Sequence, residues 1–124
     1  MDLNSLTESV IGAAYEVSNT LGAGLLEKLY ECALVRELTL RRLSVRSQVV
    51  YPVTYKELVI GEYTPDLVVE DNLIVELKCV DRFAPTHLAQ CLSYLHASGL
   101  PLALLLNFQH RKVECRRVSR PDRG

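Results

Sequence analysis

The first forty residues have the hydrophobic spacing of α-helices. Apolar residues recur at helical intervals from Leu6 to Val17, and the sequence Ser5-x-x-Glu8 has the form of a capping box, which predicts a helix that begins there. The glycine-containing run at 21–24 interrupts this pattern, and a second apolar stripe follows over about residues 25–41. We therefore expect two helices joined by a tight connection.

The middle of the chain alternates instead with the period of two expected of strands, which is clearest at Val49, Tyr51, Val53 and Tyr55. Residues 58–63, 66–70 and 73–80 indicate three further strands, and the turn pair Asp71-Asn72 joins the last two. Hairpins in this order predict an antiparallel meander.

The last third of the chain returns to a helix and then to strands. Pro85 is typical of a first helical turn, and Gly99 is typical of a helix end, so a helix is expected from Pro85 to about Ser98. The apolar run at 102–107 predicts a strand buried on both faces, and residues 113–118 predict a final strand. The element order indicates an α/β fold with a mixed sheet flanked by helices.

Length and composition narrow the class of protein. With 124 residues and 48% hydrophobic residues, the chain suits one domain over residues 1–118 and a polar tail at 119–124. The net charge of −1 is low for a dedicated non-specific nucleic-acid binder, and the basic clusters at 36–46 and 111–123 suit solvated surface. The four cysteines form no C-x-x-C pair, which argues against a zinc site. Without a signal peptide or a long apolar run, a cytoplasmic protein with no membrane partner is expected.

One segment concentrates charge among apolar residues. Pro65-Asp66 is followed by nine residues and then by Glu76-Leu77-Lys78. Glu76 and Lys78 share a face of one strand, and the intervening turn folds Asp66 back beside them. Such charges are costly among apolar neighbours unless they are paired or bind a metal. The spacing alone does not decide between a catalytic site and an ion pair near the sheet edge.

The helix over 85–98 adds polar residues to this picture. His87, Gln90 and Tyr94 fall on one helical face, and we expect the opposite face to pack on the core through Leu88, Cys91, Leu92 and Leu95. A solvated helix face would explain the same pattern. However, a glutamine and a tyrosine gain little from solvent alone, which favours a site there.

Several short motifs occur together in one order: Gly24-x-x-Glu27-x-x-Tyr30, Pro65-Asp66, Glu76-Leu77-Lys78 and Gln90-x-x-x-Tyr94. With the strand at 104–108 and the ending at 113–118, they resemble the GxxExxY proteins, a branch of the PD-(D/E)XK nuclease superfamily. The likeness extends over roughly residues 4 to 118. It departs at Gln109-His110, where a small residue such as glycine is expected.

The resemblance implies a restriction-endonuclease-like core and a metal-dependent nuclease that acts on DNA more readily than on RNA. It implies that Mg²⁺ or Mn²⁺ is held by Asp66 and Glu76, with Glu27 and the Leu77 carbonyl as further ligands. Three other residues would assist the reaction: Lys78, Gln90 and Tyr94. From the residues alone, Glu27 would be taken for a surface acid, so its role depends on the resemblance.

Other functions stay open from the sequence. The fold could serve as a non-catalytic nucleic-acid-binding module, or as a structural or oligomer-forming protein in which Lys78 and nearby arginines satisfy the acids. The clustered acids argue against simple binding, because binding requires basic groups. Since so small a chain has no evident separate recognition domain, a homo-oligomer or a protein partner could supply specificity.

Overall fold

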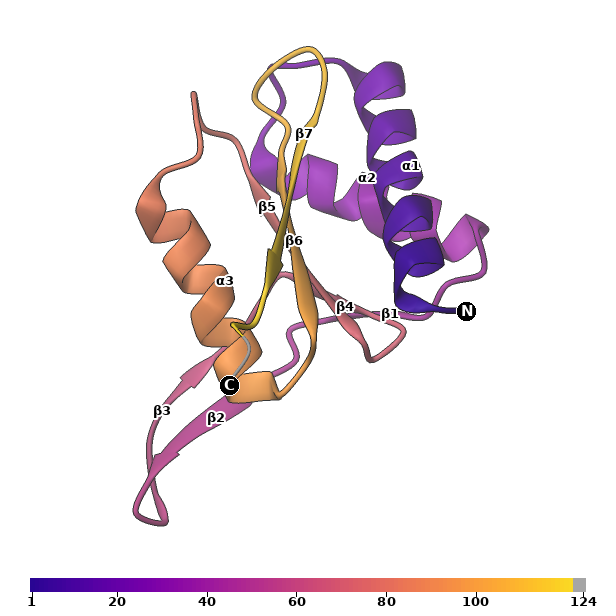
Figure 1. Cartoon of the computed structure of the whole chain (residues 1–124). Coiled ribbons are helices and arrows are strands. Elements are labelled where there is room, and N and C mark those ends of the chain that lie inside the picture. The colour runs from indigo at the N-terminus through magenta and orange to yellow at the C-terminus, as the bar shows by residue number, and fades with distance from the viewer. Residues whose placement is uncertain (122–124) are drawn as a thin grey trace.

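The computed structural model describes residues 1–121 (Figure 1). The helices of this part are α1 (Leu3–Leu21), α2 (Glu27–Leu40) and α3 (Pro85–Ser98). The strands are β1 (Val45–Ser47), β2 (Tyr51–Tyr55), β3 (Leu58–Tyr63), β4 (Leu67–Val69), β5 (Leu73–Lys78), β6 (Leu102–Asn107) and β7 (Glu114–Ser119). None of these helices is long and apolar enough to cross a membrane.

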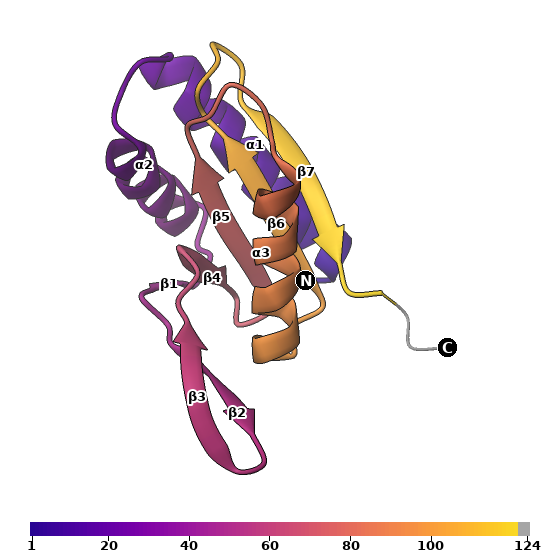
Figure 2. The same cartoon turned by 90° about the vertical axis from the view of Figure 1, so that its left-hand side faces the viewer.

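Five strands form one mixed sheet in the order β1-β4-β5-β6-β7. The β5–β6 pair is parallel, and the other neighbouring pairs are antiparallel. Helices α1 and α2 lie on one face of this sheet, and α3 lies on the other (Figure 2). The α/β architecture with a mixed sheet flanked by helices is therefore confirmed.

The side chains of β5 alternate between two hydrophobic layers. Leu73, Val75 and Leu77 pack in the layer under α1 and α2, whereas Ile74 packs in the layer under α3. All four are fully buried, and each contributes roughly 1.5–3 kcal/mol to the free energy of unfolding. Because the period is two, Glu76 lies on the α3 side of the sheet.

The predicted meander is wrong, because the strand expected from residue 49 does not join the main sheet. Gln48 has a φ of 61°, and this left-handed residue turns the chain between β1 and β2. Strand β1 then pairs with β4, whereas β2 and β3 pair only with each other and project from the body of the molecule (Figures 1 and 2).

The ends of the elements differ slightly from expectation. Helix α1 begins before the expected capping box, because the Asp2 side chain accepts the Ser5 N–H at 2.7 Å and is itself an effective N-cap. Helix α3 spans Pro85–Ser98 and ends at Gly99 with a φ of 74°, as predicted. Strand β7 includes Ser119, one residue of the expected tail, and residues 122–124 lie outside the described residues.

Candidate active site

The Asp66 and Glu76 carboxylates meet where β4 begins and β5 approaches its end. The antiparallel register of β4 and β5 places Leu67 opposite Val75, so Asp66 falls beside Glu76. The Asp66 backbone N–H donates to Glu76 Oε1 at 3.0 Å, and the Leu77 N–H donates to Asp66 Oδ2 at 2.8 Å. The predicted antiparallel pairing of these segments is confirmed, and the backbone holds both carboxylates in place.

Burial makes this pair of acids electrostatically unfavourable when both are ionised. Glu76 is only 4% exposed. Burial first, and then the Asp66 charge, raise the pKa of Glu76 to about 7. Burial also raises the pKa of Asp66, against the opposing effect of the Leu77 N–H. A cation beside the pair would therefore favour its ionised form.

Lys78 and Tyr94 approach the same Glu76 oxygen from different elements. Lys78 Nζ lies 3.6 Å from Glu76 Oε2, and the Lys78 side chain is 20% exposed. The Tyr94 hydroxyl donates to Glu76 Oε2 at 3.3 Å. Burial and the Glu76 charge raise the pKa of Tyr94, which keeps its hydroxyl protonated as a donor.

Helix α3 presents a different face to the sheet from the one expected. Tyr94 is 5% exposed and packs with Cys91 and Leu95, whereas Leu92 is 38% exposed and does not belong to the core. The expected separation of a polar face from a core face is therefore wrong at Tyr94 and Leu92. The tyrosine ring fills the layer under α3 while its hydroxyl reaches Glu76.

The other polar residues of α3 have distinct surroundings. His87 Nδ1 accepts the Ala84 N–H at 3.0 Å, so His87 stabilises the beginning of the helix. Gln90 is half-buried, one helical turn before Tyr94. The structure thus brings Asp66, Glu76, Lys78 and Tyr94 together, with Gln90 on the adjoining turn.

Glu27 approaches the site from the opposite side of the sheet. It is the first residue of α2, whose helix covers the face away from α3. Partial burial and the Asp66 charge raise the pKa of Glu27, and the Lys78 charge opposes them. Among residues 1–121, no three histidine, cysteine or acidic side chains gather closely enough to hold a metal ion. Glu27 is therefore affected by the Asp66 charge, but its carboxylate does not lie close enough to Asp66 and Glu76 to form one metal-binding cluster with them.

Glu31, one helical turn after Glu27 on α2, is a further acidic neighbour of the site. Its side chain is only 13% exposed and lies 2.6 Å from Lys28 Nζ. The Glu31 charge raises the pKa of Asp66. The signal in the sequence was the i,i+4 spacing of Glu27 and Glu31, which places both acids on one face of α2.

Tyr30 of the G-x-x-E-x-x-Y motif fixes the beginning of α2. Its ring is fully buried and stacks on Phe108, with centroids 4.9 Å apart and planes 11° from parallel. Its hydroxyl donates to the Gly22 carbonyl at 2.6 Å and accepts the Leu25 N–H at 3.2 Å. The tyrosine therefore holds the α1–α2 connection closed, three residues from Glu27.

We expect Tyr30→Phe to lower the free energy of unfolding by about 1–2 kcal/mol, because two backbone groups in a partly buried turn lose their partner. Denaturation with urea measures the change. Tyr15→Phe is the matched control, since Tyr15 is 36% exposed and its substitution should change stability very little. Equal losses for the two variants would contradict the structural role of the Tyr30 hydroxyl.

Asn107 connects the ends of β5 and β6 beside the site. Its fully buried amide donates to the Val80 carbonyl at 2.8 Å and accepts the Val80 N–H at 3.1 Å. The Phe108 N–H donates to the Lys78 carbonyl at 2.9 Å. The segment that carries Lys78 is therefore fixed on its β6 side as well as on its β4 side.

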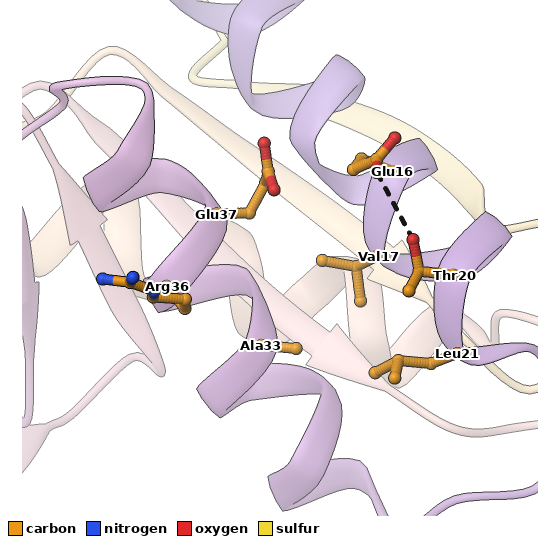
Figure 3. A pocket seen from close by; sticks show the side chains of 7 residues that line it. All are labelled: Glu16, Val17, Thr20, Leu21, Ala33, Arg36 and Glu37. Carbon is orange, nitrogen blue, oxygen red and sulfur yellow. Dashed lines mark hydrogen bonds between the residues drawn. The ribbon is translucent and has the colours of Figure 1, made fainter.

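A pocket of about 230 Å³ lies elsewhere, between α1 and α2 (Figure 3). Its lining combines charged and apolar side chains: Glu16, Val17, Thr20, Leu21, Ala33, Arg36 and Glu37. None of the residues expected in the active site lines it.

Comparison with known proteins identifies the superfamily of the chain. Residues 4–118 match the PD-(D/E)XK nuclease superfamily. The chain belongs to this superfamily. No curated protein matches its sequence.

Two solved structures have a similar fold. An alkaline exonuclease from Laribacter hongkongensis superposes with a TM-score of 0.54 and 14% identity, over 93% of this chain and 83% of that chain. The same exonuclease in complex with dAMP gives a TM-score of 0.54 and 13% identity, over 94% of this chain and 83% of that one. At this identity the likeness concerns the fold.

The donor set at the end of β5 suits the divalent cation that this superfamily implies. Mg²⁺ prefers oxygen ligands and uses one or two carboxylates together with water and phosphate. Each acid has one oxygen engaged by a backbone N–H, while Asp66 Oδ1 has no hydrogen bond within residues 1–121. Since every fully buried side-chain polar atom in this part has a partner, that oxygen is not fully buried. The residues present therefore fit a hard cation.

Proposed function

We propose that this protein is a divalent-metal-dependent nuclease that hydrolyses phosphodiester bonds, with DNA as its preferred substrate. The observation that carries the proposal is the pairing of the Asp66 and Glu76 carboxylates through backbone hydrogen bonds, with Lys78 Nζ 3.6 Å from Glu76. Burial raises the pKa of both acids, and the Asp66 charge raises that of Glu76 further, so the ionised pair destabilises the fold unless a cation balances it, which argues for a functional role.

In this proposal Asp66, Glu76 and the Leu77 carbonyl hold Mg²⁺ or Mn²⁺, and Glu27 acts through an intervening water. When bound, such a cation polarises the phosphoryl group and lowers the pKa of water, which supplies a nucleophile at neutral pH. The donation from Tyr94 to Glu76 keeps that carboxylate oriented. Lys78 stabilises the negative charge that develops on the phosphoryl oxygens, and Gln90 positions the substrate backbone.

The proposed preference for DNA depends on fewer observations than the proposed hydrolysis of phosphodiester bonds. The alkaline exonuclease with the similar fold has been solved with dAMP, a deoxynucleotide. The finer assignment to the GxxExxY branch depends on Gly24, Glu27 and Tyr30, of which Tyr30 has the structural role described above. A homo-oligomer or protein partner would supply the substrate specificity that so small a domain lacks.

The direct test incubates the purified chain with linear and circular DNA and with RNA, each single-stranded and double-stranded, in Mg²⁺, Mn²⁺ or EDTA. We expect cleavage of DNA that requires metal. Asp66→Asn should abolish cleavage, whereas Glu8→Gln, which alters an exposed acid on α1, should retain it. Cleavage that persists in Asp66→Asn or in EDTA would overturn the proposal.

Metal binding can be measured apart from activity. We expect Mg²⁺ or Mn²⁺ to raise the melting temperature of the wild type by mass action, and Asp66→Ala or Glu76→Ala to abolish the rise. Without metal, Asp66→Asn should equal or exceed the wild type in stability, because one of two repelling buried charges is gone. An Asp66→Ala variant that binds metal as the wild type does would show that the ligands are wrong.

The same titration distinguishes the alternatives. A structural module, in which the Lys78–Glu76 ion pair is the whole purpose of these charges, would show no metal effect. A non-catalytic DNA-binding module would bind DNA in a salt-dependent manner without metal and would cleave nothing.

A further inference from the structure

Two loops follow the ends of the parallel strands β5 and β6 and lie at the same end of the sheet (Figures 1 and 2). The β5–α3 loop spans residues 79–84, and the β6–β7 loop spans residues 108–113. His110 Nε2 of the second loop lies 2.8 Å from the Asp81 carbonyl oxygen of the first. The two loops therefore contact each other directly after Lys78, the last residue of β5.

The β6–β7 loop is held by its backbone, which leaves its charged side chains free. The Ser18 hydroxyl of α1, in a residue only 3% exposed, donates to the Arg111 carbonyl at 3.0 Å and accepts the Val113 N–H at 3.1 Å. The Arg111 and Lys112 side chains take no part in these bonds and are exposed. A loop that is fixed before a ligand arrives loses little conformational entropy on binding it.

Three exposed cations on these loops have no acidic partner. They are Arg82 of the β5–α3 loop and Arg111 and Lys112 of the β6–β7 loop. None of them forms an ion pair within residues 1–121. The sequence of the two loops contains a single acid, Asp81, against these three cations. The surface beyond the end of β5 is therefore cationic, although the whole chain has a net charge of −1.

The other basic cluster of the chain, at residues 36–46, has a different electrostatic character. Arg41 Nε lies 2.9 Å from Glu37 Oε2, and Arg46 forms an ion pair with Asp71. Acids thus neutralise two cations of this cluster, which also lies on and after the half of α2 that is remote from the candidate active site. Phosphate backbones require an uncompensated cationic surface, so the two loops fit them better than this cluster does.

We propose that Arg82, Arg111 and Lys112 bind the phosphate backbone of the nucleic-acid substrate where it leaves the candidate active site. The proposal rests on the proposed nuclease function and adds to it the path of the substrate, which runs from Lys78 over both loops. Arginine and lysine bind phosphate through charge-assisted hydrogen bonds. Such contacts position a nucleic acid without reading its sequence, so this surface contributes affinity rather than sequence specificity.

The salt dependence of DNA binding tests this path. Fluorescence anisotropy with a labelled duplex in Mg²⁺ measures the dissociation constant, with Asp66→Asn as the parent chain so that binding is measured without cleavage. We expect Arg111→Gln/Lys112→Gln to raise the dissociation constant roughly tenfold at about 0.1 M salt. The slope of its logarithm against the logarithm of salt concentration should fall by about 1.8, since about 0.9 is lost with each phosphate contact. Arg82→Gln should lower the slope by about 0.9.

A second double variant controls for net charge. Arg36→Gln/Arg42→Gln also removes two exposed cations, but from the other basic cluster, and it should keep the slope of the parent. Arg111→Lys/Lys112→Arg keeps both charges on the loop and should also keep that slope. A change of fold would not be corrected in this way, and the glutamine variants leave the backbone contacts of the loop in place.

The outcomes separate this proposal from the proposed function. Equal slopes for the parent and for Arg111→Gln/Lys112→Gln would overturn the path, even if the wild type cleaves DNA with metal. A lowered slope would support the path, even if the wild type cleaves nothing and the proposed hydrolysis is wrong. Poly-glutamate that displaces the duplex at an equal concentration of charges would assign the loops to an acidic protein and would overturn the proposal.

Discussion

Replacing Lys78 with alanine is expected to slow DNA cleavage by roughly 10²–10³-fold, the usual loss on removing one electrostatic stabiliser of a transition state. Lys78 Nζ lies 3.6 Å from Glu76 Oε2 on a strand end fixed from both sides, so the ammonium is held in place before substrate arrives. Metal affinity should be retained, because an ammonium is not a ligand. Single-turnover cleavage and metal titration on the same sample measure both quantities.

The conservative variant distinguishes this role from a purely structural one. Lys78→Arg keeps the charge but replaces a compact ammonium with a planar fork, so we expect it to recover little of the cleavage rate. Its melting temperature should nevertheless stay close to that of the wild type. If Lys78→Ala instead lowers the melting temperature strongly and the wild type cleaves nothing with any metal, Lys78 only neutralises buried acids.

Local patterns in the sequence were sufficient to predict most helices and strands of the fold. The apolar run of β6 and the proline and glycine at the ends of α3 correctly predicted both elements. The turn between β4 and β5 has Glu70 and Asp71 at φ values of 53° and 51°, next to the predicted pair Asp71-Asn72. This short connection permits only antiparallel pairing, so the proximity of Asp66 and Glu76 could be predicted.

Tertiary contacts explain what the sequence pattern missed. A period of two cannot show that Gln48 is left-handed, and so the division into β1 and the separate β2–β3 hairpin was not predicted. Helical spacing places Tyr94 on a polar face, but a tyrosine can bury its ring and still satisfy its hydroxyl through Glu76. The proximity of Glu31 to Asp66 depends on how α2 packs against the sheet, which spacing does not encode.

The pH dependence of stability provides a second large effect, which requires no substrate. Glu76 has an ordinary pKa of 4.5 and a folded-state pKa of about 7, because burial and the Asp66 charge disfavour its ionised form. A raised carboxyl pKa gives the folded state stability that is fully present below pH 4.5 and is lost as the pH rises through 7. A shift of this size corresponds to about 3 kcal/mol. In EDTA, the wild type should therefore be less stable at pH 8 than at pH 5.

Glu76→Gln should remove this contribution while keeping an oxygen that can accept the Asp66 N–H. We expect the variant to match the wild type near pH 4 and to exceed it by about 3 kcal/mol at pH 8, measured by urea denaturation in EDTA. The comparison isolates Glu76, because Asp66 and Glu27 shift in the same direction but are present in both proteins. Glu8→Gln should show no such pH-dependent difference from the wild type.

Adding Mg²⁺ at pH 8 should make the wild type more stable than Glu76→Gln, since only the wild type offers two ionised carboxylates to the cation. A constant difference between Glu76→Gln and the wild type from pH 5 to 8 would show that Glu76 is ionised without cost, and the argument that this pair of acids requires a cation would then be wrong.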